Sequence, residues 1–441
     1  MSSATGNIGA ASISKIPELR KKILFTIFIL AIYRLGSHVP TPGIDTVALG
    51  AFFDRASGTM FGMFNMFSGG ALKRFSIFAL GIMPYISSSI IMQLLTIVVP
   101  AFERLSKEGD LGRKRITQYT RYGTVVLCVI QALFIAKGLE SMRGPNGSSV
   151  VVNPGAYFKF MTVITLTTGT TFIMWLGEQI TERGIGNGIS LIIFAGIAAN
   201  IPEGFSRTLS LLKSGQIAAF SAVFLLAVMV AAIAFIIFME RSQRRIPVQY
   251  AKRVVGRKMY GGQNSHLPLK LNSAGVIPPI FASSIIMFPA TIAQYVDHPI
   301  FKALQNAMMS RSLLYNVVYV SLIIFFTYFN TAVTFNPTDV AENLKRNGGF
   351  VPGIRPGKST SDYIDKVLTR ITLVGAIYIA LVCVLPEFVT MKFKVSFYFG
   401  GTSLLILIGV ALDTVSQIES YLLTRNYDGF IKNARMRGRR G

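Results

Sequence analysis

Basic residues in this chain are concentrated in every second gap between long apolar segments. Lys and Arg gather just before the first apolar segment, and again in blocks at 104–121, 241–270, 345–370 and 425–440. The gaps between these blocks hold only scattered basic pairs. Cytoplasmic loops of membrane proteins carry an excess of Lys and Arg. The pattern therefore predicts a chain that crosses a membrane repeatedly and keeps both of its ends in the cytoplasm.

The composition supports a membrane protein and argues against a soluble one. Of the 441 residues, 51% are hydrophobic and only 15% are charged, yet the net charge is +24. A soluble domain usually carries about 25% charged residues. A nucleic-acid-binding protein could be equally basic, but its charge would lie on an exposed face. Cys128 and Cys383 lie within apolar segments, so we expect small core residues and neither a disulfide framework nor a metal site.

Ten segments are candidates for membrane spans, because a spanning helix needs about 20 apolar residues. They are 22–39, 75–99, 119–137, 157–177, 186–202, 216–240, 273–294, 313–335, 370–388 and 396–414. An even number of spans returns the C-terminus to the side of the N-terminus. The sequence thus predicts an all-α polytopic membrane protein with about ten transmembrane helices.

Ten spans divide into two halves of five, and an odd count per half makes the second half enter from the opposite side. Two such halves would be inverted repeats. The predicted organisation is a cytoplasmic tail at 1–21, a first half at 22–202, an external linker at 203–215, a second half at 216–414 and a basic tail at 415–441. Helix breakers occur at matching positions, in the second span (Gly81, Pro84) and in the seventh (Pro278, Pro279, Pro289). Such breaks point to the functional centre of inverted-repeat proteins, although Gly and Pro are also common in membrane helices generally.

The predicted membrane interior is nearly free of charge. Arg34, Glu178, Glu240 and Asp413 each lie near one end of a span. Ionisable groups within the bilayer usually mark ion sites and proton relays, and an intramembrane enzyme needs paired catalytic groups there. The sequence therefore argues against an enzyme and predicts no cofactor and no metal. An ion-coupled secondary transporter with inverted repeats remains the alternative, since it would share the topology.

Three further segments are unusual. In 57–73, Met60, Met63, Phe64 and Phe67 have the spacing of one helical face. This segment is either a short movable helix that fills a cavity or an interfacial helix on the bilayer. The glycine-rich run 184–188 does not have the spacing of a nucleotide-binding loop, so we expect a tight turn. The long basic loops 241–271 and 336–369 could bind an anionic partner.

Five runs of sequence resemble the bacterial SecY family. They are Met63-Phe-Asn-Met-Phe-Ser-Gly-Gly-Ala, Phe78-Ala-Leu-Gly-Ile-Met-Pro-Tyr-Ile-Ser, Gln179-Ile-Thr-Glu-Arg-Gly-Ile-Gly-Asn-Gly-Ile-Ser, Phe350-Val-Pro-Gly-Ile-Arg-Pro-Gly and Tyr398-Phe-Gly-Gly-Thr-Ser-Leu-Leu-Ile. The resemblance implies two halves that form a clamshell around a central pore. It implies a channel that passes unfolded secretory polypeptides across the bacterial plasma membrane and releases signal sequences and transmembrane segments laterally into lipid.

The resemblance also implies roles for individual residues. The pore ring would be Ile82, Ile86, Ile185, Ile189, Ile406 and, in the seventh span, Ile277 or its neighbour Val276. The segment 57–73, with Met60, Met63, Phe64 and Phe67, would be the plug. The lateral gate would include Ser87, Gln93, Asn272 and Ser283. Arg253, Arg257, Lys258 and Arg355 would dock a motor or a ribosome. The implied partners are SecE, SecG, the motor ATPase SecA, the ribosome, signal-bearing precursors and anionic lipids.

Overall fold

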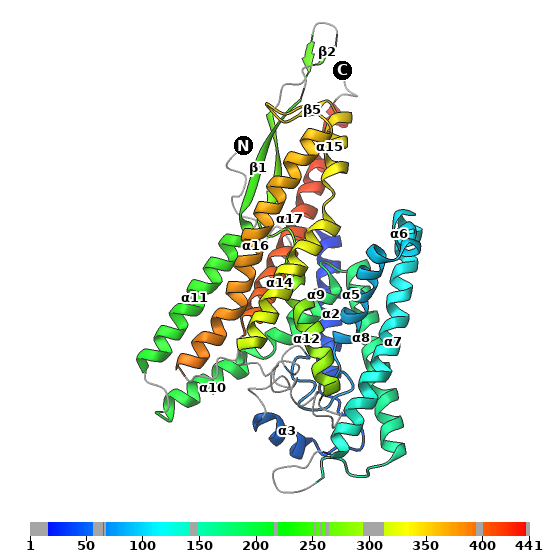
Figure 1. Cartoon of the computed structure of the whole chain (residues 1–441), viewed down its shortest axis with the longest axis vertical. Coiled ribbons are helices and arrows are strands. Elements are labelled where there is room, and N and C mark those ends of the chain that lie inside the picture. Colours follow the sequence, from blue (N-terminus) through cyan, green and yellow to red (C-terminus); the bar gives the residue numbers. More distant parts are fainter. Residues whose placement is uncertain are drawn as a thin grey trace. The chain divides into compact units, whose positions relative to one another are not determined.

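The computed structural model of the chain describes residues 16–55, 65, 68–141, 149–215, 219–250, 253–255, 258–260, 264–293, 313–393 and 400–437. Figure 1 shows these residues as a ribbon coloured along the sequence. They divide into two compact units. Unit 1 comprises Met1–Ser206, Met287–Ser310 and Val410–Gly441, and unit 2 comprises Arg207–Ile286 and Arg311–Gly409.

Helices form most of the described chain. In chain order they are α2 (Pro17–Gly36), α3 (Thr46–Arg55), α5 (Met83–Val98), α6 (Pro100–Lys107), α7 (Asp110–Ser141), α8 (Ala156–Arg183), α9 (Gly188–Ala198), α10 (Ile201–Lys213), α11 (Ala219–Arg241), α12 (Ile277–Ala293), α14 (Leu313–Thr334), α15 (Pro337–Arg346), α16 (Lys358–Phe393) and α17 (Gly401–Arg437). The strands are β1 (Gln243–Tyr250), β2 (Arg253–Val255), β3 (Lys258–Tyr260), β4 (Asn264–Lys270) and β5 (Gly349–Phe350).

Several of these helices are long and apolar enough to cross a membrane. Within the described residues there are 6 such stretches: Asp110–Glu140, Ala156–Arg183, Gly188–Lys213, Leu314–Arg346, Lys358–Pro386 and Gly401–Leu422. The pair α5 and α6, bent by 98°, would raise the number to 7 if it counts as one span. The prediction of a multi-pass, predominantly helical membrane protein is thus confirmed. The count of ten spans and the inverted arrangement of the halves stay predictions.

The second predicted span, 75–99, is helical only in its second part. The α5 helix begins at Met83, and residues 68–82 form mainly a run of turns. Gly81 has a φ of +57°, which only glycine adopts without strain. Pro84 lies in the first helical turn, where its missing N–H and fixed φ are tolerated. These two residues therefore set where the helix begins.

The run of turns 68–82 is buried rather than exposed. Thr41 N donates to Phe75 O (2.8 Å) and Ile77 N donates to Val39 O (3.0 Å), so the chain after α2 pairs with it. On its other side the α8 helix packs so closely that a Cβ at Gly169 would collide with the Ile77 carbonyl oxygen. Irregular backbone is tolerated at membrane depth only where protein or a water-filled cavity surrounds it. Here the surrounding protein supplies the hydrogen bonds.

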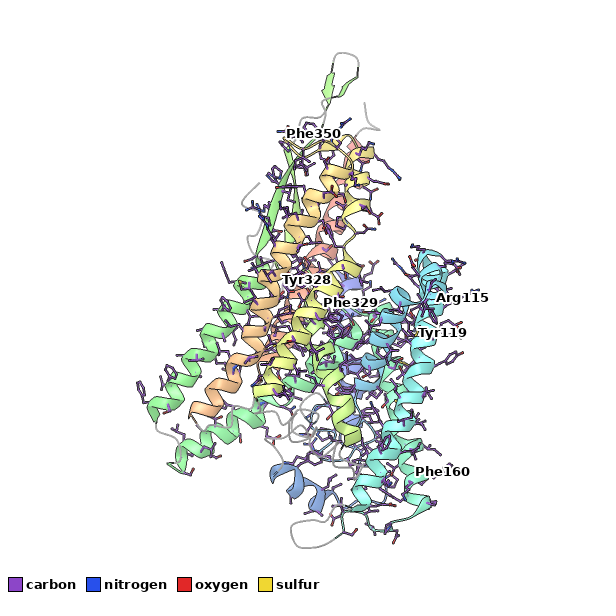
Figure 2. The ribbon with its side chains drawn as sticks, viewed as in Figure 1. Arg115, Tyr119, Phe160, Tyr328, Phe329 and Phe350 are labelled. Atoms are coloured by element: carbon purple, nitrogen blue, oxygen red, sulfur yellow. The ribbon has the colours of Figure 1, made fainter. Side chains whose placement is uncertain are left out.

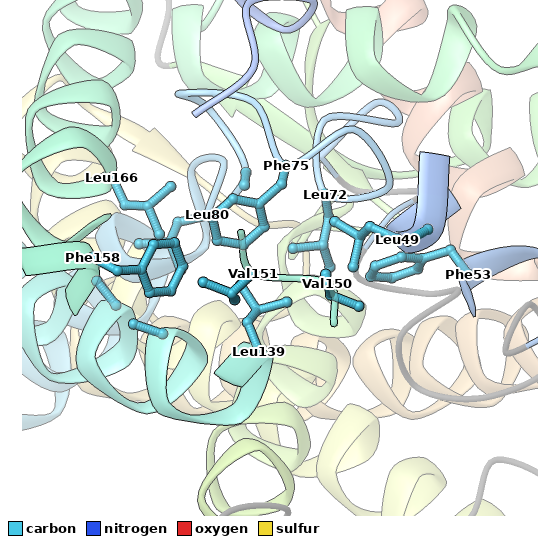
Figure 3. Packing of buried hydrophobic residues seen from close by; sticks show 14 of the residues in the cluster. Leu49, Phe53, Leu72, Phe75, Leu80, Leu139, Val150, Val151, Phe158 and Leu166 are labelled. Atoms are coloured by element: carbon cyan, nitrogen blue, oxygen red, sulfur yellow. The ribbon is translucent and has the colours of Figure 1, made fainter. Parts of the chain in front are cut away.

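An apolar cluster in unit 1 connects this run of turns with α3, α7, α8 and the short segment at 149–151 (Figure 3). Leu72 and Phe75 of the turns meet Leu139 of α7 and Val150 within the cluster. Phe158 of α8 is 4% exposed there. The cluster fills the space beside the turns with side chains, so their position is determined by packing as well as by hydrogen bonds.

In unit 2, both long basic loops fold into one body. β4, β1 and β5 form an antiparallel sheet in that order, with Ile246 of β1 opposite Leu267 of β4. Ile246 and Val248 are buried at alternate positions of β1. Ile246 belongs to an apolar cluster with Val351 and Ile364. Strands in this region were not predicted. The period-2 alternation at 246–248 was the available signal.

Two helices of unit 2 pack along each other and extend from this sheet. Tyr328 of α14 donates its hydroxyl proton to Thr369 O of α16 (3.4 Å), and Figure 2 shows Tyr328 and Phe329 together on α14. Phe350 lies on β5, which pairs with β1 through Gln249. The sheet is thereby joined to the helices that follow it in the sequence.

Substituting Gly169 tests the close packing between α8 and the run of turns. We expect Gly169→Ala to destabilise the protein by about 1–3 kcal/mol, because overpacking of a filled interior forces the backbone to shift. The matched control is Gly50→Ala in α3, where the nearest atom to an added Cβ is 4.0 Å away. Thermal unfolding of the two purified variants measures the difference. Equal unfolding temperatures would contradict the packing described for Gly169.

Candidate pore and gate residues

The α5 and α12 helices begin in the same way. Gly81 and Gly275 both have a positive φ, of 57° and 65°. Each is followed by two residues and then a proline in the first helical turn, as Gly-Ile-Met-Pro-Tyr-Ile at 81–86 and Gly-Val-Ile-Pro-Pro-Ile at 275–280. The two runs therefore align without a gap. The alignment matches Ile82 with Val276 and Ile86 with Ile280.

The aligned residues are similar in burial as well as in sequence. Ile82 and Ile86 are 4% and 5% exposed, and Val276 and Ile280 are 5% and 6% exposed. Ile277, by contrast, is 38% exposed. Val276 also packs against α17, where a Cβ at Gly409 would collide with its Cγ1. Residues 276 and 278–284 are all buried, so Ile277 is the exposed position at the start of α12.

The start of α9 differs from the sequence expectation. Ile185 and Ile189 were expected to share one helical face, and this is wrong because the helix begins only at Gly188. Asn187 caps it, since its Oδ1 accepts hydrogen bonds from Ile189 N (3.1 Å) and Ser190 N (3.3 Å). Ile185 lies before this cap. On α9 itself the residue one turn after Ile189 is Ile193, which is 3% exposed.

The glycine-rich run before α9 forms the tight turn that the sequence predicted, with a φ of +88° at Gly186. Side chains from three helices satisfy its backbone. Ile185 N donates to Thr26 Oγ1 (3.2 Å), Gly186 N to Gln417 Oε1 (3.0 Å) and Gly188 N to Thr181 Oγ1 (2.9 Å). The turn is therefore held by α2, α17 and α8 together.

The predicted gate residues occupy α5 and the start of α12. On α5, Ser87 and Gln93 are half-buried. The neighbouring Ser88 is 2% exposed and donates to Thr120 O on α7 (2.8 Å). Ser283 on α12 is 1% exposed and donates to Ile280 O (2.9 Å). The α5 helix belongs to unit 1, and residues 277–286 of α12 belong to unit 2.

Asn272 has a charged partner that the sequence analysis did not identify. Its Nδ2 donates to Glu240 Oε1 (2.7 Å) and to Gly275 O (3.1 Å). The Tyr378 hydroxyl donates to the same Glu240 oxygen (3.5 Å). Glu240 therefore joins the end of α11 to α16 and to the turn before α12. Within the described ranges, no three His, Cys, Asp or Glu side chains could together hold a metal ion.

The predicted docking residues belong to the sheet-bearing body of unit 2. Arg355 is exposed, whereas the adjacent Ile354 packs against the apolar cluster beneath the sheet. Arg253 and Lys258 lie in the β2–β3 hairpin, but their side chains fall outside the described part of the structure. Arg257 and the plug residues Met60, Met63, Phe64 and Phe67 also lie outside the described residues.

Replacing the cap of α9 tests the arrangement at Ile189. Asn187→Ala removes the acceptor for two backbone N–H groups, and loss of such a cap costs about 1 kcal/mol. We expect faster amide hydrogen exchange at residues 188–191 and a lower unfolding temperature. Asn187→Asp is the matched control, because it keeps the acceptor and adds a favourable charge at a helix N-terminus. Equal exchange in both variants would contradict the capping role.

Comparison with known proteins places the chain in a family. A family model described as SecY matches residues 76–415. The "Protein translocase subunit SecY" of Escherichia coli (strain K12) is 52% identical over 441 residues, covering 99% of this chain and 97% of that protein. Two solved structures share the fold at low identity. "The plug domain of the SecY protein stablizes the closed state of the translocation channel and maintains a membrane seal" has a TM-score of 0.64 at 17% identity, covering 94% of this chain and 96% of that one.

The second structure, "Sec61 in the Canine ribosome-channel complex from the endoplasmic reticulum", has a TM-score of 0.61 at 15% identity, covering 94% of this chain and 96% of that one. The family match covers residues 76–415, and the 52% identity extends over nearly the whole of both chains. These ranges include the glycine–proline starts of α5 and α12 and the glycine turn before α9. This multi-pass membrane protein belongs to the SecY family.

Proposed function

We propose that this chain is the channel-forming subunit of a bacterial protein translocase. It passes unfolded secretory polypeptides across the plasma membrane and releases signal sequences and transmembrane segments laterally into lipid. The proposal rests on the 52% identity between this chain and a protein named as a translocase subunit. The match covers 97% of that protein's length. The chain itself performs no chemical reaction in this proposal and needs no cofactor. It forms two inverted five-helix halves around a pore, with both termini in the cytoplasm.

The pore constriction in this proposal is a ring of branched apolar side chains. Its members are Ile82, Ile86, Ile185, Ile189, Ile406 and, at the start of α12, Ile277 or its neighbour Val276. Ile185 lies just before α9, as Ile82 lies just before α5, so a ring residue need not lie within the helix itself. Of the two neighbours at the start of α12, Ile277 is the more exposed.

An apolar ring suits both tasks of such a channel. It offers ions no polar partner, and a hydrophobic constriction closes a pore by dewetting. It also makes no specific polar contact with a passing chain, so polypeptides of any sequence can pass. Below the ring, the segment 57–73 acts as the plug, with Met60, Met63, Phe64 and Phe67 as its apolar face. The sealing role that the solved relative's title gives to its plug domain supports this part of the proposal.

The lateral gate lies between α5 and α12 in this proposal, and it is held shut by weak polar contacts. Ser87 and Gln93 belong to one side, and Asn272 and Ser283 belong to the other. Hydrogen bonds between membrane helices average only about 0.6 kcal/mol, which suits a gate that must reopen. Glu240 holds Asn272 through a 2.7 Å hydrogen bond, so it orients the second side.

The sheet-bearing body of unit 2 is the proposed docking surface for the motor ATPase SecA and for the ribosome. Arg253, Arg257, Lys258 and Arg355 supply its positive charge. A fold neighbour is described as part of a ribosome–channel complex, which supports the ribosome as a partner. SecE and SecG complete the channel, anionic lipids contact its basic loops, and the energy for transport comes from SecA or the ribosome. No observation favours the ion-coupled transporter over this channel.

Reconstitution tests the proposed function. Proteoliposomes would contain the chain with SecE and SecG, and would receive SecA, ATP and a signal-bearing precursor. We expect protection of the precursor from external protease that depends on both ATP and the signal. Absence of protection with SecA bound to an intact complex would overturn the channel proposal.

The same proteoliposomes test the ring assignment. Ile277→Ser should raise the resting ion leak, because it introduces a polar group at the constriction. Ile280→Ser is the control on the same helix, since this residue is 6% exposed and does not belong to the proposed ring. A larger leak for the Ile280 variant would assign the ring position to that residue instead.

Charge reversal tests the docking surface. Arg355→Glu should abolish SecA-driven export, because Arg binds carboxylates and phosphates through a fixed fork, whereas a Glu carboxylate would repel these anionic groups of the partner. Abundance of the chain in the membrane should not change, since Arg355 is exposed. Arg346→Glu changes the net charge equally at a side chain that is 76% exposed, and it should retain most export. Normal export by the Arg355 variant would remove this residue from the docking surface.

A further inference from the structure

Arg34 is a charged residue near the end of an apolar helix, and it belongs to none of the pore, plug, gate or docking residues proposed above. It lies in the last turn of α2 and is only half-exposed. Charged residues near or within membrane spans are costly and usually have a specific partner. One partner here is a backbone group, because Arg34 Nη1 donates to Gly69 O at 2.7 Å. Glu203 also interacts electrostatically with Arg34. A hydrogen bond of this length from a cation is among the stronger ones in proteins.

Tyr33 makes a second contact to the same turn. Its side chain is 2% exposed, and its hydroxyl donates to Ser68 O at 3.4 Å. Its ring stacks on that of Phe78 at a centroid distance of 5.9 Å, farther along the run of turns. Two consecutive residues of α2 therefore contact two consecutive carbonyl groups. The Arg34 bond is the stronger of the two, because it is shorter and charge-assisted.

The turn that receives these bonds is closed by its own hydrogen bonds. Gly70 N donates to Asn65 O (2.8 Å), and Lys73 N donates to Asn65 Oδ1 (2.8 Å). Ser68 Oγ donates to Asn65 O (3.1 Å) and accepts from Leu72 N (3.2 Å). Asn65 is 8% exposed, so these bonds are shielded from water. The turn is a preformed element and does not depend on α2 for its internal shape.

The opposite side of the turn rests on α9. Gly69 has a φ of +67°, and a Cβ added to it would lie 2.8 Å from Gly196 Cα. The backbone of the turn therefore touches the backbone of the helix that carries Ile189 and Ile193. The turn is held between the end of α2 and the middle of α9, and Arg34 supplies a charge-assisted hydrogen bond to it.

We propose that Arg34, assisted by Tyr33, is a positioning residue that holds the turn 68–70 against α9 in the resting channel. This inference rests on the proposed function, because the turn lies at the C-terminal end of the plug segment and leads through residues 71–81 to Ile82. Loss of the Arg34 bond leaves the Gly69 carbonyl without its charged donor. The turn then separates more readily from α9, and the closed state of the channel loses stability relative to the open state.

A simpler role would be that Arg34 extends its charge towards the membrane surface, as long basic side chains near helix ends do. That role requires a cation at this position but no contact with Gly69. It predicts altered membrane insertion or abundance of the chain when the charge is lost. It predicts that Tyr33→Phe leaves the ion leak unchanged. The two roles are therefore separated by measuring channel closure in an assembled complex.

The test uses the reconstituted complex with two readouts: ion leak without precursor, and protection of a precursor whose signal has a shortened apolar core. Arg34→Gln should raise both by about tenfold, the size that a hydrogen bond to a charged group supports. Export of a normal precursor should be retained.

Tyr33→Phe should raise the ion leak by a smaller factor than Arg34→Gln. The double variant should raise the leak by less than the product of the two single effects, because both residues hold one turn. Arg20→Gln, which removes an exposed charge from the same helix, should behave as wild type.

Each outcome has a distinct meaning. One outcome is a wild-type complex that discriminates between signals and an Arg34→Gln complex with the same ion leak and the same signal selectivity. That result overturns the role proposed for Arg34 and leaves the proposed function standing. If Arg34→Gln does not assemble, the isosteric Tyr33→Phe decides, and an unchanged leak in that variant overturns that role. A wild-type complex that protects no precursor overturns the proposed function and this inference together.

Discussion

The structure depends on the requirement that backbone polar groups in a membrane find partners inside the protein, because the lipid offers none. Helices meet this requirement by themselves, so most of the chain is helical. The run of turns 68–82 cannot, and its partners come from the chain after α2, from Arg34 and from its own side chains. The short turn before α9 is satisfied in the same way by Thr26, Thr181 and Gln417.

Both irregular segments lead directly into helices that carry proposed pore residues. The first ends at Ile82, and the second ends at Asn187, the cap that precedes Ile189. A residue at the start of a helix is positioned by the turn before it as much as by the helix. The side chains that hold these turns therefore influence the constriction without belonging to it. This is the physical link that we propose between Arg34 and the closure of the channel.

Much of the candidate site could be predicted from the sequence, and the failures have identifiable causes. Gly81 and Pro84 indicated a broken helix, and the break lies where those residues predict it. The pairing of Ile185 with Ile189 failed because periodicity was counted through the cap at Asn187. The strands β1 and β4 were missed because topology alone explains a basic loop, and the short alternation at Ile246 was not given enough weight.

The sequence by itself determined the class of protein, because the spacing of apolar segments and basic blocks reflects the thickness of a bilayer and the bias of cytoplasmic loops. It also determined the family through long motif runs. Only the tertiary structure decided which polar groups meet. Arg34 with Gly69, and Glu240 with Asn272, are separated by many residues, and no local pattern records such pairs. Their contacts arise because buried carbonyl and amide groups must be satisfied by whatever side chain packing brings to them.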